Sequence, residues 1–269
     1  MASPFVSRLW LWRLPALVAA AATLLFAGGF SLALRGTLGR PIGAAPPPPS
    51  AAAALVKPPG RRLLLVLGDS LARGTGDETG RGFAADVLDA LRKRGPADVA
   101  NLSVNGAESS ELVELVRSAN VRSLAASADV ILVSIGGNDL SHAVARGPEA
   151  AGARIVEDIT ASRDRYLANL REILGALRSA NSTAPILLLG LYDPFGDAGP
   201  GGRLGSSVIL RWNGLLQETA LGYPRTSVVQ SFDLFERRPD RLGVDRFHPN
   251  RRGYEAIGSR MVQLLPEGS

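Results

Sequence analysis

The chain has 269 residues, contains no cysteine and carries a formal net charge of +5 at pH 7. The lack of cysteine excludes disulfide bonds, thiol catalysis and metal sites built on thiolates. Residues 1–60 hold five basic side chains and no acidic one, and residues 61–269 balance 25 basic against 25 acidic side chains, so nucleic acid is not an expected partner.

An uncharged, apolar segment spans residues 14–34. As a helix it is roughly 30 Å long, about the thickness of the hydrocarbon core of a bilayer. Residues typical of a membrane interface precede it: Arg8, Trp10, Trp12 and Arg13. We therefore predict an N-terminal transmembrane helix within residues 1–34, with the rest of the chain outside the cytoplasm. The alternative is a signal sequence cleaved near the small residues 31–33, followed by secretion.

Residues 35–60 are rich in proline and alanine, with four consecutive prolines at 46–49. This composition cannot build a hydrophobic core and favours a semi-rigid polyproline spacer. At about 3.1 Å per residue the spacer would reach roughly 80 Å. We predict a linker that connects the anchor to a folded domain in residues 61–269.

Short apolar runs alternate with amphipathic stretches in residues 61–269. The runs predict strands at 63–67, 99–104, 130–135, 186–191 and 227–230. The amphipathic stretches predict helices at 83–94, 109–118, 155–179, 210–221 and about 251–265. This alternation is typical of a parallel sheet with helices on both faces, in one domain large enough to bury a core.

The first predicted strand ends in Gly68-Asp69-Ser70. Ligands of open α/β sheets bind beyond the carboxyl ends of the strands, so Ser70 places a hydroxyl where chemistry is usually done. A serine in such a turn is also a common helix cap, and we expect Asp69 to shape the turn. The glycine-rich segment 73–80 follows, but it lacks the ending of a phosphate-binding P-loop.

The next two strand ends carry candidate hydrogen-bond donors. Gly106 follows Asn105 in a dipeptide common in turns, and a glycine N–H can point at an oxyanion without steric obstruction. Asn138 follows two glycines, and its amide can donate a second hydrogen bond to developing negative charge. A turn in which Asp139 caps the next helix is the structural alternative.

His142 and His248 are the two histidines of the chain. Asp245 precedes His248 by three residues and can hold one ring nitrogen while the other faces Ser70. We expect no acid to orient His142, which is predicted to be a surface or packing residue. Asn250 is predicted to cap the final helix.

Taken together, these segments resemble the four sequence blocks of the SGNH (GDSL) hydrolase family. The matching blocks are Gly68-Asp69-Ser70-Leu71, residues 101–106, Gly137-Asn138-Asp139 and Asp245-x-x-His248-Pro249. The resemblance extends over residues 62–265 and is strongest to bacterial, membrane-anchored lipase/acylhydrolase-like members. It implies a three-layer α/β/α domain of the SGNH, flavodoxin-like type, with a five-stranded, mainly parallel sheet.

The resemblance also implies a serine esterase or acylhydrolase that cleaves a lipid, short-chain acyl or acetylated-glycan ester. Ser70 would be the nucleophile, His248 the base and Asp245 its orienting acid. The backbone N–H groups of Ser70 and Gly106 and the Asn138 side chain would hold the oxyanion. No metal or cofactor is implied, and the sequence leaves acyl chain length and oligomeric state open. The alternatives are a cell-envelope O-acyltransferase with the same site and a non-catalytic binding module.

Overall fold

The computed structural model describes residues 57–145, 153–194 and 199–267. All of them belong to one compact unit. The predicted anchor and most of the predicted linker lie outside the described residues. Within the described ranges, no helix is both long and apolar enough to cross a bilayer.

Five parallel strands form the sheet, in the order β2-β1-β3-β4-β5. Their bounds are β1 (Arg62–Gly68), β2 (Ala97–Asn101), β3 (Val130–Ser134), β4 (Ile186–Leu189) and β5 (Thr226–Val229). Four consecutive aliphatic residues of β1, at 64–67, are completely buried. Burial on both faces is what a continuous apolar run predicts. All four strand pairs are parallel, so the predicted, mainly parallel sheet is confirmed.

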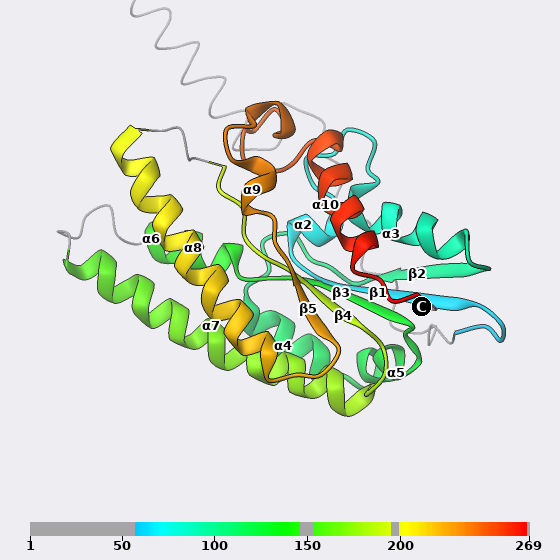
Figure 1. Cartoon of the computed structure of the whole chain (residues 1–269). Helices are drawn as coiled ribbons and strands as arrows, with labels where there is room; N and C mark the ends of the chain where they lie inside the picture. Colours follow the sequence, from blue (N-terminus) through cyan, green and yellow to red (C-terminus); the bar gives the residue numbers. More distant parts are fainter. Residues whose placement is uncertain (1–56, 146–152, 195–198, 268–269) are drawn as a thin grey trace, which may run out of the picture. The chain divides into compact units, whose positions relative to one another are not determined.

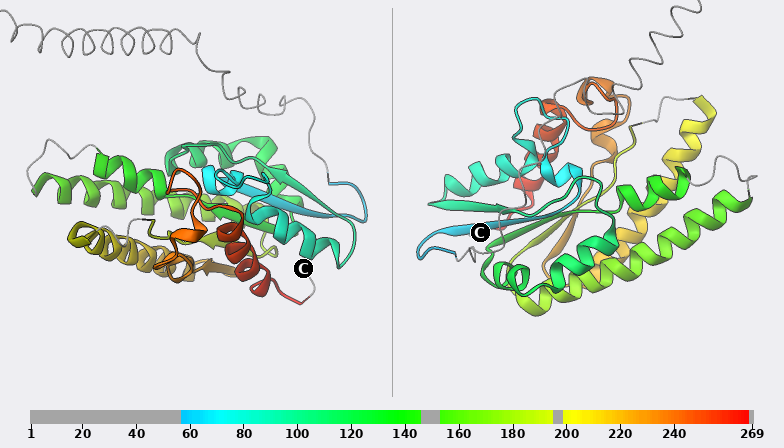
Figure 2. Two further views of the ribbon diagram at one scale, coloured as in Figure 1. Left: turned by 90° about the horizontal axis from the view of Figure 1, so that it is seen from above. Right: turned by 180° about the vertical axis from the view of Figure 1, so that it is seen from behind.

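Alternate side chains of β1 point to opposite faces of the sheet. Leu63, Leu65 and Leu67 join a core that includes α4, α5, α7 and α8, whereas Leu64 and Val66 join the core shared with α3 and α10. Figures 1 and 2 show these two helical layers on either side of the strands. The fold therefore has the predicted three layers.

The helices of the first layer are α4 (Ser109–Arg117), α5 (Ala119–Ser127), α6 (Gly137–Ala145), α7 (Ala153–Ala180) and α8 (Gly199–Leu221). The second layer contains α2 (Ser70–Arg73), α3 (Gly82–Arg92), α9 (Phe232–Phe235) and α10 (Arg251–Gln263). A short 3-10 helix, η1 (Pro239–Arg241), precedes the loop that leads into α10.

Several elements differ from the prediction. β2 begins and ends earlier than the expected 99–104, although Leu102 and Val104 still donate backbone hydrogen bonds to β1. α5 and α6 were not predicted; the Gly-Gly-Asn-Asp sequence at the start of α6 is typical of a turn. α8 begins at Gly199, well before the expected residue 210, although the glycines and Pro200 of this segment disfavour helix.

Candidate active site

The carboxyl end of β1 is built around a glycine. Gly68 has φ +128°, and a Cβ at this position would overlap the Ser134 backbone oxygen of β3. Asp69 then caps α2: its carboxylate accepts from Leu71 N at 3.1 Å and from the Ser134 hydroxyl at 2.9 Å. Asp69 shapes the turn, as predicted. Ser70 is consequently the first residue of α2, at the carboxyl edge of the sheet.

Asp69 is only 3% exposed. Burial raises the pKa of its carboxyl to about 6, against the opposing effect of the hydrogen bonds from Ser134 and the backbone. The residue next to Ser70 therefore carries a carboxylate that ionises near neutral pH in the folded state.

The His248 ring lies between Ser70 and Asp245. Its Nε2 is 2.9 Å from the Ser70 hydroxyl oxygen, and its Nδ1 is 2.6 Å from Asp245 Oδ2. The other Asp245 oxygen accepts from the backbone N–H groups of Phe247 and His248, each at 3.0 Å. A carboxylate at Nδ1 favours the tautomer with the proton on that nitrogen and leaves the Nε2 lone pair facing the hydroxyl.

Asp245 is well placed to remain ionised. Partial burial opposes its charge, but the hydrogen bonds from the His248 ring and from two backbone N–H groups outweigh that effect and lower its pKa. The arrangement can therefore stabilise a positive charge on the imidazole when the ring takes up a proton.

The loop that carries His248 is held on several sides. Gly243 N donates to His248 O at 2.7 Å, and the Tyr192 hydroxyl donates to Phe247 O at 2.6 Å. Asn250 Oδ1 accepts from Gly253 N at 3.1 Å, which confirms the predicted cap of α10.

The glycine-rich segment 73–80 supports this loop from below. Gly76 has φ +92°, and a Cβ there would lie 2.6 Å from His248 Cβ. The Asp77 carboxylate accepts from Thr79 within the segment and from Gly82 N at the start of α3, and it pairs with Arg251 at the start of α10. These contacts assign the segment a supporting role under the histidine.

The two candidate oxyanion donors lie on neighbouring segments. Asn138 Nδ2 donates to Ala107 O at 2.9 Å, which fixes the amide plane and leaves its second N–H for another acceptor. Gly106 has φ +79°, and a Cβ there would meet no atom within 4 Å. The space beside its backbone is therefore open.

The expectation that no acid accompanies His142 is wrong, and the alternative role of Asp139 as a cap of the next helix is not observed. His142 does have an acid beside it: its Nδ1 contacts the Glu108 carboxylate. Asp139 lies in the first turn of α6, and its carboxylate accepts from Ser109, the first residue of α4, instead of capping the next helix. The Ser109–Asp139 and Glu108–His142 pairs each join segments about 30 residues apart, so no local sequence pattern predicts these contacts.

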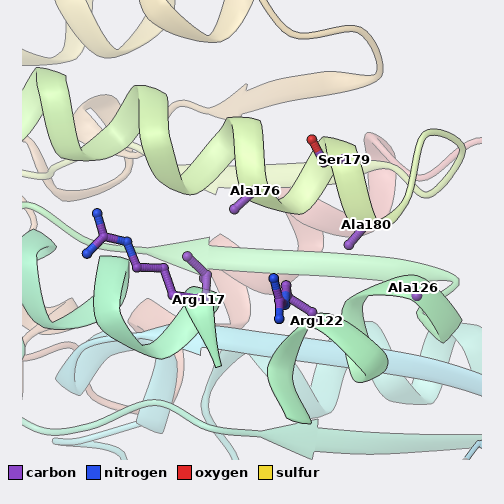
Figure 3. Close-up of a pocket in the computed structure, with 7 residues that line it drawn as sticks. Arg117, Arg122, Ala126, Ala176, Ser179 and Ala180 are labelled. Atoms are coloured by element: carbon purple, nitrogen blue, oxygen red, sulfur yellow. The ribbon is translucent and has the colours of Figure 1, made fainter. Parts of the chain in front are cut away.

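Among the described residues, no group of three or more His, Asp or Glu side chains is placed to hold a metal ion. A cavity of about 450 Å³ lies between α4, α5 and α7 (Figure 3). Its lining consists of Val116, Arg117, Arg122, Ala126, Ala176, Ser179 and Ala180. None of the predicted site residues lines it, so this cavity is separate from the candidate site.

Comparisons with known proteins show the family of this chain. The GDSL-like lipase/acylhydrolase family model matches residues 66–256. The uncharacterized protein YpmR of Bacillus subtilis (strain 168) is 27% identical over 208 residues, covering 75% of this chain and 80% of that protein.

Solved structures show the same fold. The lipase Lip_vut3 from a goat rumen metagenome aligns with a TM-score of 0.67 at 24% identity, covering 76% of this chain and 97% of that one. Axe2, an acetylxylan esterase from Geobacillus stearothermophilus, aligns with a TM-score of 0.56 at 17% identity, covering 78% and 95%.

The three-layer fold with its five parallel strands is that of the SGNH hydrolases. The family model covers most of the length of the chain, including the ends of β1 and β3 and the His248 loop. The chain belongs to the GDSL-like lipase/acylhydrolase family and is a carboxylic ester hydrolase.

The buried Asp69 carboxyl generates a prediction about stability. Its pKa is about 6 in the folded state and 3.8 as the reference value, so the unfolded chain ionises first as pH rises. This group therefore stabilises the fold below pH 4, and the contribution is lost between about pH 4 and 6. At about 1.4 kcal/mol per pKa unit the loss is on the order of 3 kcal/mol.

Asp69→Asn keeps the size and a capping oxygen but cannot ionise. We expect the free energy of unfolding of the variant, relative to the native chain, to rise by that amount between pH 4 and 7. Denaturant titrations followed by circular dichroism at several pH values measure the difference. Parallel stability curves for the two proteins would contradict the assignment.

Proposed function

We propose that this protein is a serine esterase or acylhydrolase that uses Ser70, His248 and Asp245 as a catalytic triad. The observation that carries the proposal is the hydrogen-bonded series from Asp245 through His248 to the Ser70 hydroxyl. A serine is activated when a base lies within hydrogen-bond reach and a third group orients that base.

The reaction proceeds through an acyl-enzyme. The Ser70 oxygen attacks the ester carbonyl carbon while its proton passes to His248 Nε2, and Asp245 stabilises the resulting imidazolium. Collapse of the tetrahedral intermediate breaks the bond to the alcohol oxygen, which leaves with the proton from His248. Water then attacks the acyl-enzyme with His248 again as base, which releases the carboxylic acid and restores the Ser70 hydroxyl.

Three donors would stabilise the oxyanion of each intermediate. The backbone N–H of Ser70 stands at the start of α2, where helical N–H groups have no acceptor within the helix. The Gly106 N–H and the second N–H of the Asn138 amide complete the set. Donors fixed before the reaction stabilise developing charge without reorganisation at the moment of reaction.

The substrate is a carboxylic ester with a lipid, short-chain acyl or acetylated-glycan group. Structures with this fold include both a lipase and an acetylxylan esterase, which supports this range. Transfer of the acyl group to a polyol would need the same residues, with the polyol replacing water in the second half of the reaction. The family assignment favours hydrolysis over a purely binding role.

We also propose that residues 1–34 anchor the enzyme in a membrane and that residues 35–60 link the anchor to the hydrolase domain outside the cytoplasm. The length of the uncharged segment 14–34 and the aromatic and basic residues before it support this arrangement. The enzyme would then work in the cell envelope.

The triad generates a graded prediction for p-nitrophenyl acetate and butyrate hydrolysis. Ser70→Ala removes the nucleophile and should lower kcat by roughly 10⁶. Asn138→Ala removes one oxyanion donor and should lower kcat by about 10²–10³. Undiminished hydrolysis by the Ser70 variant would refute the proposed function. Product analysis with a polyol in the assay distinguishes the activities, because an acyltransferase gives acylated polyol instead of free acid.

The contact beneath His248 generates a second prediction. Gly76→Ala forces a Cβ against His248 Cβ and Pro249 O, which displaces the ring from Ser70. We expect kcat to fall by roughly 10- to 100-fold. Gly80→Ala is the matched control, because Gly80 also has positive φ, at +68°, but its Cβ would meet nothing within 4 Å. Equal losses in the two variants would attribute the effect to backbone strain instead of the contact.

The proposed membrane anchor in residues 1–34 generates a third prediction. The full chain should sediment with membranes after cell lysis, and a chain that begins at residue 35 should remain in the supernatant. N-terminal sequencing of the mature protein detects cleavage near residues 31–33. A full chain with an intact N-terminus in the supernatant would contradict the anchor.

A further inference from the structure

Two of the proposed oxyanion donors, Gly106 and Asn138, lie on segments that follow different strands. Gly106 follows β2, and Asn138 lies in the first turn of α6 after β3. β1 separates β2 from β3 in the strand order. Gly106 lies two residues beyond the last backbone hydrogen bond to β1, made by Val104, and Asn138 lies four residues beyond the end of β3. Strand pairing alone therefore does not fix the distance between Gly106 and Asn138 or their orientation, and contacts outside the sheet contribute.

Contacts just after Gly106 fasten this segment to α6. Ala107 O accepts from the Asn138 amide at 2.9 Å. Two residues further, Ser109 donates its backbone N–H to Asp139 Oδ2 at 3.0 Å and its hydroxyl to Asp139 Oδ1. Both carboxylate oxygens are thus used by a single residue of the other segment.

The Ser109–Asp139 pair lies in the interior, with Ser109 0% and Asp139 6% exposed. The neighbouring Glu108–His142 pair joins the same two segments at the surface, where the His142 side chain is 51% exposed. Hydrogen bonds and ion pairs at the surface contribute little because water competes for both partners. The interior pair can therefore hold the spacing, together with the hydrogen bond from Asn138 to Ala107 O.

Helix α7 supports the interior pair from behind. Asn169 Nδ2 donates to the Ser109 hydroxyl oxygen at 2.9 Å, and the Ser162 hydroxyl donates to Asp139 O at 2.7 Å. α7 packs against both α4 and α6, and Figure 1 labels the three helices. Three helices therefore meet at these two residues.

We propose that Asp139 is a positioning residue of the oxyanion hole: its carboxylate, by binding Ser109 twice, keeps Gly106 and Asn138 at the separation that a tetrahedral oxyanion requires. Asp139 is the chain neighbour of Asn138, and Ser109 lies three residues after Gly106. The inference rests on the proposed function, because it assigns a purpose to this contact only if these donors bind an oxyanion.

The positional precision that oxyanion donors require explains why a carboxylate suits this position. Oxyanion donors must be held to within about 0.5 Å of the productive geometry. A carboxylate accepts two hydrogen bonds in fixed directions at once, whereas a neutral amide has one accepting oxygen. Charge-assisted hydrogen bonds are also shorter and stronger than neutral ones, so the contact is stiff.

Asp139→Asn tests this role with little change in volume. The amide accepts from one Ser109 donor through its oxygen and loses the other bond. We expect kcat for p-nitrophenyl butyrate to fall by roughly 10- to 100-fold, with KM changed by less than about threefold, because the loss falls on the transition state. His142→Gln, which alters the exposed contact between the same segments, is the control and should retain kcat within about twofold.

A double-variant cycle distinguishes positioning from general support of the fold. If Asp139 acts through the oxyanion donors, Asp139→Asn should lower kcat by a smaller factor in the Asn138→Ala background than in the native chain. The inference would be overturned if the loss of kcat in the double variant equals the product of the two single losses. It would also be overturned if Asp139→Asn alone leaves kcat unchanged. Ser109→Ala removes one of the two bonds and should give a smaller, likewise non-additive loss, so it carries the test if the Asp139 variant does not fold.

The outcome also separates this inference from the proposed function. An active Ser70→Ala protein would refute the triad. An inactive Ser70→Ala protein together with a fully active Asp139→Asn protein would leave the triad standing and overturn only the positioning role.

Discussion

The close approach of β1 to β3 at Gly68 is the constraint on which the site depends. Gly68 stands in register with Ser134, and the Asp69 backbone N–H continues the ladder to Ser134 O at 3.0 Å. Because no side chain separates the two strands here, the chain can turn at once into α2, with Asp69 as its cap. The close backbone approach and the Asp69 cap together place Ser70 at the carboxyl edge of the sheet.

Two buried aspartates at the carboxyl edge of the sheet each accept a hydrogen bond from a serine of another segment. Asp69 accepts from the Ser134 hydroxyl, and Asp139 accepts from the Ser109 hydroxyl, so the chain after β1 is tied to β3 and the chain after β3 is tied to the segment after β2. Burial raises the pKa of both carboxyls, because removing a charged carboxylate from water is unfavourable. Each aspartate stands directly beside a residue assigned to the chemistry, Ser70 or Asn138.

The histidine reaches the serine from a point 178 residues further along the chain. No strand positions it. Its loop is supported by Gly76 below, by the Tyr192 hydroxyl on Phe247 O, and by the contact of Arg251 with Asp77. The glycine-rich segment 73–80 has the composition of a ligand-binding loop. Because it follows Ser70 and contacts the His248 loop, it connects the proposed nucleophile to the proposed base. A site of this kind depends on loop packing as much as on the sheet.

The sequence by itself determined the architecture and the candidate residues. The continuous aliphatic run 63–67 predicts a strand buried on both faces of a parallel sheet. Ser70, Gly106 and Asn138 were found because each follows a predicted strand. Their roles, with those of Asp245 and His248, stay predictions. Only the tertiary structure decided that Asp139 binds Ser109, that Glu108 accompanies His142 and that Gly76 lies under His248. It also placed α6, whose first residues Gly137, Asn138 and Asp139 favour a turn as readily as a helix. Hydrophobic periodicity is a local property of the chain, whereas hydrogen bonds between side chains at neighbouring strand ends join residues that only the packed sheet brings together.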